Sequence, residues 1–232
     1  MINNRSILAL IPARSGSKGL PGKNTKLLCG KPLISWTIDH AKKSKYLNDI
    51  IVSTDCEKIA DISKKYGAYV PFLRPKELAT DDAKAIDVMI HAIDYLEKQG
   101  RLYDLVMYLQ PTSPLRGPED IDSAIESLFL SNAQVVVGVC EAEYPSYAMN
   151  TLPPDRCMKH FLKPELINKN RQDFPIEYRI NGAIYLAYSK YLKLRGILFG
   201  EETYAYIMPR QRSVDIDNEM DFKFAEFILN SR

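Results

Sequence analysis

The chain has 232 residues, of which 46% are hydrophobic and 26% charged, so it can bury the core of one large domain or of one domain with an appendage. Its 31 Lys and Arg nearly balance its 29 Asp and Glu, and the formal charge of +2 argues against a protein that coats nucleic acid. No apolar run reaches the ~18 residues of a membrane span, and the N-terminus lacks the pattern of a secretory signal.

Short β-branched runs alternate with helix-length amphipathic stretches along the first 140 residues. The runs predict strands over 6–13, 50–53, 69–73, 105–109 and 135–139. The amphipathic stretches predict helices over 33–44, 58–66, from Asp81 or Asp82 to about 98, and 119–130. The run 135–139 is so uniformly apolar that both of its faces must be covered. This alternation is typical of an α/β protein with a doubly wound, mostly parallel sheet.

The alternation stops between 141 and 178, where prolines, tyrosines and charged residues follow no helical or strand period. A structureless insertion of this length is uncommon in a compact domain and usually functional. It is either a loose surface loop or an arm that packs on something, most simply a second subunit, and its apolar content favours the arm. Strands over 182–187 and 204–208, a helix near Tyr191 and a helix over 219–229 complete the core, which we expect to comprise 1–140 and 179–232.

The four cysteines are dispersed, with no CxxC spacing, and there are only three histidines. This pattern favours reduced thiols in a cytoplasmic protein over disulfides or a zinc site. Any chemistry is therefore expected from carboxylates, lysines and arginines.

The loop after the first predicted strand, Arg14-Ser15-Gly16-Ser17-Lys18-Gly19-Leu20-Pro21-Gly22-Lys23-Asn24, combines three glycines with three cations. Glycines let backbone N–H groups approach an anion closely, and the carboxyl end of a parallel strand is where α/β proteins bind ligands. The spacing matches neither the Walker loop nor the GxGxxG dinucleotide fingerprint. A glycine-rich turn with solvated lysines is the alternative, and a triphosphate-binding loop of another lineage is favoured.

Two carboxylates stand two residues apart in Val214-Asp215-Ile216-Asp217. If this segment is a strand, both side chains lie on one face. Paired carboxylates suit Mg²⁺, which typically takes one or two of them plus substrate phosphates. The alternative is that Asp217 caps the last helix and Asp215 is a solvated strand end. The cationic loop favours the metal, because a Mg²⁺–nucleotide site needs both groups.

Two further polar segments lie next to predicted strands, one after the strand over 105–109 and one at the start of the strand over 182–187. The prolines of Gln110-Pro111-Thr112-Ser113-Pro114-Leu115-Arg116 stiffen a loop whose side chains can bind a polyhydroxylated ligand, although a capped turn fits equally well. Arg179-Ile180-Asn181-Gly182-Ala183-Ile184-Tyr185 contains an Asn-Gly that reads as an ordinary turn.

Six segments in one order, IPARSGSKGLPGKN, STD, RPKELATD, LQPTSPLR, NGAIY and DID, closely resemble the acylneuraminate cytidylyltransferases over nearly the whole chain. The resemblance implies a Rossmann-like nucleotidyltransferase core that binds CTP. It also implies a protruding dimerisation arm, a homodimer whose partner helps to close the sugar site, and Mg²⁺ as the cofactor.

Carried over residue by residue, the resemblance assigns most of the motif residues to the nucleotide. The residues expected to contact the triphosphate or the base are Arg14, Ser15, Lys18, Lys23, Asn24, Arg74, Ala83 and Ala85. Lys23 and Arg14 are expected to act in catalysis, and Asp217 is the candidate general base. Asp215 and Asp217 would carry Mg²⁺. The family often has a hydroxyl residue at the position of Ala85, so a base contact is expected to be lost there.

The sugar site implied by the resemblance consists of Gln110, Ser113, Arg171, Arg179, Tyr185 and Phe199. The expected reaction joins CTP to N-acetylneuraminate or a close analogue, giving the CMP-sugar and pyrophosphate. Legionaminic and pseudaminic acid remain open as acceptors, because the arm begins Tyr144-Pro145-Ser146-Tyr147 without the Lys of some sialic acid enzymes. KDO is less favoured, since Gln110 to Pro114 holds no carboxylate, and a non-catalytic sugar-nucleotide-binding module is least favoured.

Overall fold

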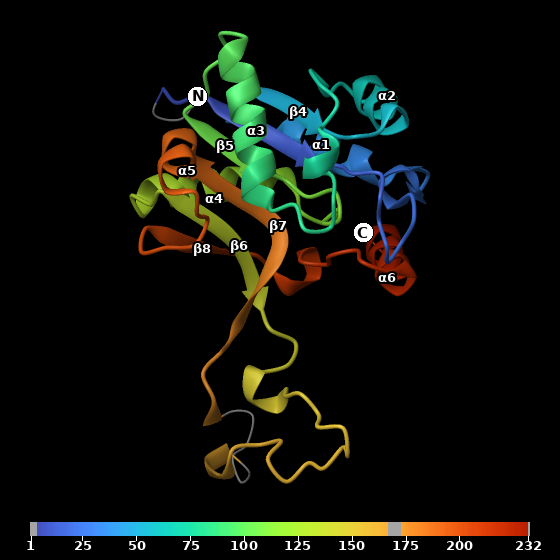
Figure 1. Ribbon diagram of the computed structural model, residues 1–232, viewed down its shortest axis with the longest axis vertical. Helices are drawn as coiled ribbons and strands as arrows, with labels where there is room; N and C mark the ends of the chain where they lie inside the picture. The colour runs from blue at the N-terminus through green and yellow to red at the C-terminus, as the bar shows by residue number, and fades with distance from the viewer. Residues whose placement is uncertain (1–3, 167–172, 232) are drawn as a thin grey trace.

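The computed structural model describes residues 4–166 and 173–231, and its centre is a six-stranded sheet with the order β4-β1-β5-β7-β6-β8 (Figure 1). The strands of this sheet are β1 (Ile7–Pro12), β4 (Asp49–Ser53), β5 (Leu105–Tyr108), β6 (Val135–Glu141), β7 (Tyr178–Tyr188) and β8 (Thr203–Ile207). Only β7 runs against its neighbours; the other pairings are parallel. The mostly parallel α/β sheet predicted from the sequence is confirmed.

Helices cover both faces of this sheet. They are α1 (Leu33–Lys43), α2 (Glu57–Lys65), α3 (Ala85–Lys98), α4 (Pro118–Leu130) and α5 (Ser189–Arg195), whereas α6 (Glu219–Asn230) packs to one side of the sheet. Successive side chains of a strand point to opposite faces, so Ile7, Ala9 and Ile11 of β1 pack with α1, α2 and α4. Leu8 and Leu10 pack with α3 and α5 on the other face. This double coverage explains why the central strands are continuously apolar.

A smaller apolar cluster joins the two ends of the chain. The cluster contains Leu20, Leu28 and Leu33 from the first part of the chain and Ile216, Phe222 and Ala225 from the last. Leu28 belongs to a short hairpin of β2 (Leu27–Leu28) and β3 (Lys31–Pro32). Figure 1 shows the result, with α6 lying beside the loop that follows β1. The glycine-rich loop and the Asp215–Asp217 segment thereby become neighbours.

Three predicted elements differ from the structure. The segment 69–73 is not a full strand but makes two isolated bridges to β4 and the residue after it, because Pro71 has no N–H to continue the ladder. Helix α3 starts at Ala85 rather than at Asp81 or Asp82, because the Asp81 side chain binds two cations instead of capping the helix. Asp215 and Asp217 do not lie on a strand.

The predicted turn at Asn181-Gly182 is also wrong, because both residues lie inside β7. Gly182 has φ +72°, and the register between β6 and β7 shifts in this region, between Val137 and Val139. A β-bulge accommodates such a residue in a strand. The Asn181 side chain accepts a hydrogen bond from Ala183 N and so stabilises the bulge.

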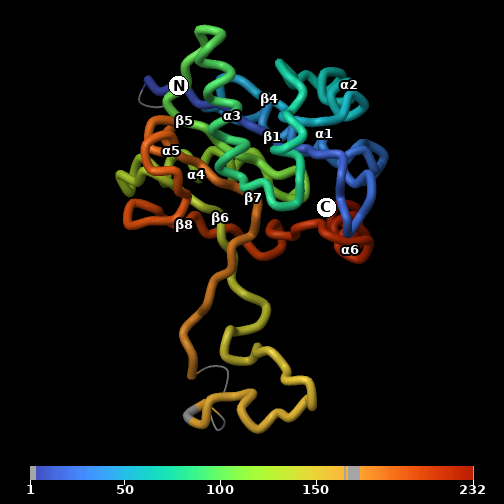
Figure 2. The backbone as a smooth tube through the Cα atoms, in the orientation of Figure 1, coloured from blue at the N-terminus to red at the C-terminus, as the bar shows by residue number. Residues whose placement is uncertain are grey.

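The arm leaves the core at the end of β6 and returns at the start of β7, where Glu141 pairs with Tyr178. Figure 2 shows it extending away from the sheet as one long excursion. Its described part has 3₁₀ turns over Ser146–Ala148 and Pro164–Leu166, and no α-helix or strand lies between Glu141 and Tyr178 among the described residues. Other 3₁₀ turns cover Lys23–Thr25, Lys76–Leu78 and Arg210–Arg212.

The expectations about membrane spans and about the cysteines can be compared with the described residues. Within them, no helix combines the length and the apolar character that crossing a membrane requires. All four cysteines are free thiols, which agrees with the expectation of no disulfide framework.

Candidate active site

A cavity of about 450 Å³ opens at the carboxyl ends of β1 and β5. The predicted site residues that line it are Arg14, Lys18, Lys23, Asn24, Arg74, Ala83, Gln110, Asp215 and Asp217. They come from five segments that are far apart in the sequence. The parallel strands bring the first four segments together, and packing of α6 against the hairpin brings the last.

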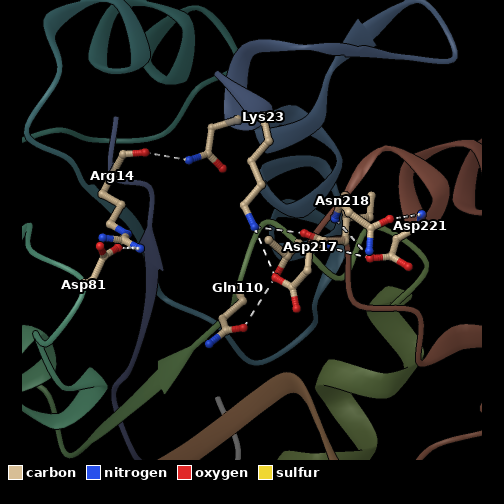
Figure 3. A network of polar contacts seen from close by, with 10 residues as sticks. Arg14, Lys23, Asp81, Gln110, Asp217, Asn218 and Asp221 are labelled. Carbon is tan, nitrogen blue, oxygen red and sulfur yellow. Dashed lines mark hydrogen bonds and ion pairs between the residues drawn. The ribbon is translucent and has the colours of Figure 1, made fainter. Parts of the chain in front are cut away.

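Arg14 and Lys18 form a cationic wall of the cavity. Arg14 pairs with Asp81 at 2.6 Å (Figure 3). Lys18 pairs with the same carboxylate at 2.5 Å. These ion pairs lower the pKa of Asp81. The Asp81 carboxylate is therefore bound to two of the loop cations that were predicted to hold the triphosphate.

Ser15 and Asn24 support the loop from outside and from within. The Ser15 N–H and hydroxyl donate to the two Asp55 oxygens at 2.8 and 2.6 Å. The Asn24 amide donates to the Arg14 carbonyl at 3.0 Å, and Asn24 is 5% exposed. Ser15 and Asn24, both predicted to bind the nucleotide, thus form hydrogen bonds that stabilise the conformation of the loop. Ser15 does not line the cavity.

Lys23 connects the loop to the carboxylate segment. Its ammonium donates to the Ile216 carbonyl at 2.9 Å and lies 3.4 Å from an Asp217 oxygen (Figure 3). The Lys23 side chain is 15% exposed, whereas that of Asp217 is 77% exposed. Gly19 makes this approach possible, because a Cβ there would lie 2.2 Å from the Asp217 carbonyl oxygen. One ammonium thus faces the cavity beside a solvated carboxylate.

Asp215 is a largely buried carboxylate with an unused oxygen. Its Oδ1 has no hydrogen-bond partner among the described residues. Burial raises the pKa of Asp215, and the Asp217 carboxylate adds to the rise, while Thr112, Lys23 and Arg179 offset part of it. The alternative that Asp215 is a solvated strand end is wrong. Asp217 is not the helix cap either, because Asn218 accepts from the N–H groups of Met220 and Asp221.

These two aspartates are the groups that fit a divalent cation. A buried carboxylate oxygen without a partner, next to a second carboxylate and a cavity, is a hard-oxygen donor set of the kind Mg²⁺ takes. In the described part of the chain no cluster of three or more His, Cys, Asp or Glu side chains could hold a metal. The remaining ligands would therefore have to come from phosphate oxygens and water.

The other end of the cavity is less charged, and Tyr108, Leu78 and Val88 line it beside Arg74. Arg74 is 6% exposed and is largely committed to protein acceptors, the Ser53 hydroxyl at 3.0 Å and the Ser53 carbonyl. Burial lowers its pKa and raises that of Tyr108 to about 12. Ala83 lines this end, whereas Ala85 begins α3 and does not.

Gln110 and Asp215 meet at Gly182. A Cβ at this glycine would lie 3.0 Å from both Asp215 Oδ2 and Gln110 Oε1. The Thr112 hydroxyl donates to Gln110 Oε1 at 3.4 Å and also interacts with the Asp215 carboxylate. The backbone of the same loop holds the carboxylate segment, since Ile216 N donates to the Thr112 carbonyl at 2.9 Å.

A second pocket of about 630 Å³ shares Asp215 with the cavity and contains Arg179 and Arg210. Arg179 donates to both oxygens of Glu143 at 2.8 and 2.9 Å and to the Ser213 carbonyl at 3.3 Å. These contacts lower the pKa of Glu143 to about 2. Arg179 thus joins the base of the arm to the segment that carries Asp215.

Three other predicted sugar residues that the structure describes, Ser113, Tyr185 and Phe199, do not line the cavity. Ser113 has no exposed surface, and its hydroxyl has no partner among the described residues. Tyr185 is half-buried and packs edge-on against Tyr108. Phe199 follows α5, at the end of the sheet where Tyr188 pairs with Leu105, opposite the cavity. Arg171 lies outside the described residues.

Sequence reasoning missed several residues that shape the site. Asp81, Thr112 and Asp55 contact predicted site residues directly, and Arg116 donates to the Gln110 carbonyl. All four stand inside the quoted motifs, so the signal was present without an assigned role. Their partners lie elsewhere in the sequence and only the fold pairs them.

Comparison with known proteins identifies the family. A family model described as cytidylyltransferase matches residues 8–226. The chain is 38% identical to the CMP-N,N'-diacetyllegionaminic acid synthase of Legionella pneumophila, over 96% of this chain and 96% of that relative. It is 39% identical to the N-acylneuraminate cytidylyltransferase of Escherichia coli O18:K1:H7 over 94% of this chain, which spans 51% of that relative. The chain belongs to the acylneuraminate cytidylyltransferase family. It is accordingly a nucleotidyltransferase, and the resemblance seen in the motifs is confirmed.

The family fold also matches a solved structure. A CMP:2-keto-3-deoxy-manno-octonic acid synthetase in complex with CTP superimposes with a TM-score of 0.72, covering 97% of this chain and 99% of that chain. The identity is 16%, so this likeness concerns the fold alone.

Proposed function

We propose that the chain transfers the cytidylyl group of CTP to a nine-carbon 2-keto acid sugar, giving the CMP-sugar and pyrophosphate. The observation that carries the proposal is a cavity lined both by cations of the loop after β1 and by Asp215 and Asp217, in which Lys23 of that loop contacts the carboxylate segment. The names of two relatives, each for transfer to or synthesis of a CMP-linked acid sugar, support this substrate class.

The nucleotide is best placed with its base at the Tyr108 end and its phosphates along the cationic loop. Leu78, Val88 and Tyr108 offer a largely apolar surface for a base. The phosphates would replace the Asp81 carboxylate on Arg14 and Lys18. Phosphoryl-type transfer depends mainly on position and charge neutralisation, which this arrangement supplies.

Asp215 and Asp217 would hold Mg²⁺, as the unpartnered Oδ1 of Asp215 and the exposed carboxylate of Asp217 suggest. When bound, the ion neutralises phosphate charge and favours departure of pyrophosphate. The other contributions to the reaction come from side chains of this chain. Asp215 must lose its proton to serve as a ligand, and its raised pKa means that this happens at a higher pH than for an exposed aspartate.

In the reaction the anomeric hydroxyl oxygen of the sugar attacks the α-phosphorus in line. A new O–P bond forms, the bond from the α-phosphorus to the bridging oxygen breaks, and pyrophosphate leaves. Lys23 lies close enough to the carboxylate segment to neutralise charge that develops at the α-phosphate. Asp217, exposed beside it, is the proposed acceptor of the hydroxyl proton, directly or through water.

The acceptor is N-acetylneuraminate or a close analogue such as a legionaminic acid. The two relatives named for these sugars are 38% and 39% identical to this chain, so sequence identity favours neither. Gln110 and the Arg179 pocket flank Asp215 and offer an amide and a guanidinium to the sugar's hydroxyl groups and carboxylate. KDO is less favoured, because the loop from Gln110 to Pro114 has no carboxylate.

We also propose that the arm joins two copies into a homodimer and helps to close the sugar site of the partner. Apolar side chains on the arm are left in solvent in the single chain, among them Tyr144 (72% exposed), Met149 (59%), Leu152 (55%) and Met158 (59%). Tyr147 and Phe174 stack at 3.7 Å between ring centroids, which ties its two limbs together. The cytoplasmic location expected from the cysteine pattern stays a prediction.

Pyrophosphate release tests the proposed reaction. The purified protein is incubated with CTP and Mg²⁺ and with N-acetylneuraminate, N,N'-diacetyllegionaminate or KDO in separate reactions. Strong pyrophosphate release with one of the first two sugars is expected and identifies the acceptor. Release with KDO alone would contradict the argument that the Gln110–Pro114 loop, which has no carboxylate, disfavours KDO. CTP binding without release would identify a binding module. Light scattering during gel filtration measures the dimer.

A further inference from the structure

Arg116 is a wholly buried guanidinium for which the site described above has no role. Its side chain has no exposed surface, and within the described residues no carboxylate lies within ion-pair distance of it. Burial lowers its pKa to about 9, with the more distant Asp120 offsetting part of the effect. Its Nε has no partner among the described residues. A buried charge held this way is unusual and calls for an explanation.

The guanidinium bridges two strands where their own pairing ends. Strands β5 and β7 pair from Leu105↔Tyr188 to Tyr108↔Tyr185, and this register would place Gln110 opposite Ala183. Arg116 Nη1 donates to the carbonyls of these same two residues, at 3.2 Å for Gln110 and 2.7 Å for Ala183. One side-chain nitrogen thus replaces the direct backbone contact between the two strands.

A third contact ties this bridge to α1. Arg116 Nη2 donates to the Thr37 hydroxyl at 2.8 Å, and that hydroxyl lies 3.5 Å from the Gln110 carbonyl. The planar guanidinium can serve these separate acceptors because its donors point in fixed directions. A lysine ammonium in the same place lacks this planar, forked arrangement of donors.

The bridged residues are those on which the carboxylate site rests. Gln110 begins the loop that holds Ile216 through Thr112, and Ala183 follows Gly182. The missing Cβ of Gly182 leaves the space into which Asp215 Oδ2 and Gln110 Oε1 both point. The separation of the two strands at Arg116 therefore sets the width of the gap that receives Asp215 and Gln110.

Stability alone does not account for this arginine. Replacing a buried charged group with an apolar side chain of similar volume is often neutral or stabilising, because desolvation of the charge is costly. We propose that Arg116 is a positioning residue that clips β5 to β7 at the separation needed to seat Asp215 and Gln110 for metal-dependent transfer. This inference rests on the proposed function.

The test compares Arg116→Lys and Arg116→Met with Leu128→Ala. Leu128 is 1% exposed near the far end of α4, and its truncation is expected to cost about 2–5 kcal/mol of stability through a cavity without touching the site. For Arg116→Lys we expect kcat for pyrophosphate release to fall about 10- to 100-fold, as for other groups that orient metal ligands, with little change in KM for CTP. Leu128→Ala should melt earlier and keep its kcat. Arg116→Met should behave like Arg116→Lys or worse; if it does not fold, Arg116→Lys carries the test.

A binding measurement separates this inference from the proposed reaction. Binding of Mn²⁺ in the presence of CTP is followed by electron paramagnetic resonance, and we expect it to weaken about 10-fold or more in Arg116→Lys. A wild-type protein that releases no pyrophosphate with any acid sugar would refute the proposed function and leave this readout intact. Unchanged Mn²⁺ affinity in a folded Arg116→Lys protein, or kinetics no different from those of Leu128→Ala, would overturn the role of Arg116.

Discussion

Substituting Gly182 by alanine should damage the site more than it damages the fold. Gly182 has φ +72°, and the added Cβ would lie 3.0 Å from Asp215 Oδ2 and from Gln110 Oε1. Gly196 at the end of α5 has φ +63° with nothing within 4 Å of an added Cβ, so Gly196→Ala is a matched control. Both variants should lose about 1–2 kcal/mol from the left-handed backbone conformation. Only Gly182→Ala should also displace the carboxylate.

The expected displacement is a few tenths of an ångström, enough to separate two oxygens from the new methyl group. Because a misplacement of about 1 Å can cost 10²-fold in rate, we expect a loss in kcat on the order of 10-fold for Gly182→Ala. Gly196→Ala should keep its kcat and show a similar fall in melting temperature, about 2–8 °C for this size of chain. Thermal melts and pyrophosphate release on the two proteins provide both numbers. Equal kcat in the two variants would refute the argument that Gly182 makes room for the carboxylate.

Four other changes test neighbouring parts of the site. Gly19→Ala would place a Cβ 2.2 Å from the Asp217 carbonyl oxygen and should lower kcat about 10-fold or more, whereas Gly16→Ala, with open space around it, should not; equal activities would contradict the close approach. Lys23→Ala should cost about 10²-fold in kcat, and a change confined to KM would assign Lys23 to ground-state binding. The pKa of Asp215 is raised by burial, so the ionised carboxylate destabilises the fold as pH rises through that pKa. Asp215→Asn should therefore abolish Mg²⁺-dependent turnover yet melt higher than wild type at pH 8, with the difference shrinking toward pH 4; a lower melting point at pH 8 would contradict the unpaired charge. Asp81→Asn frees Arg14 and Lys18 and should tighten CTP binding in calorimetry, and weaker binding would mean that Asp81 itself helps to hold the nucleotide.

The elements of the core could be predicted from the sequence because their signals are local. The buried runs at β1, β5 and β6 are apolar on both faces, and the helices between them have amphipathic stretches of sufficient length. The errors concern segments whose conformation depends on distant partners. Gly182 lies within a strand only because β6 and β7 pair around it, and nothing local in Asn-Gly distinguishes such a bulge from a turn.

The same distinction between local sequence signals and distant partners applies to the residues of the candidate site. Arg14, Lys18 and Lys23 could be predicted because glycines and cations stand together in one loop after a buried strand. Asp215 and Asp217 were paired by their spacing, although the strand expected there does not exist. The roles of Asp81 and Arg116 could not be predicted although both stand inside motifs, because their partners lie elsewhere in the sequence, in the loop after β1 and in β7. Phe199 lies away from the cavity because β7 is antiparallel to β5 and so ends at the opposite edge of the sheet. The direction of β7 could not be predicted from the sequence.

The arm interrupts the core at one point, between β6 and β7, and the described residues that line the cavity at the ends of β1 and β5 all lie outside it. A gene for this fold therefore encodes the cavity residues in two stretches, and the arm that is proposed to help close the partner's sugar site lies between them. Substitutions in the arm beyond the Glu143–Arg179 contact leave the described cavity lining unchanged. Two relatives that differ from this chain to nearly the same extent bear the names of different acid sugars. Such divergence of acceptors on a common nucleotide core is what this architecture makes easy.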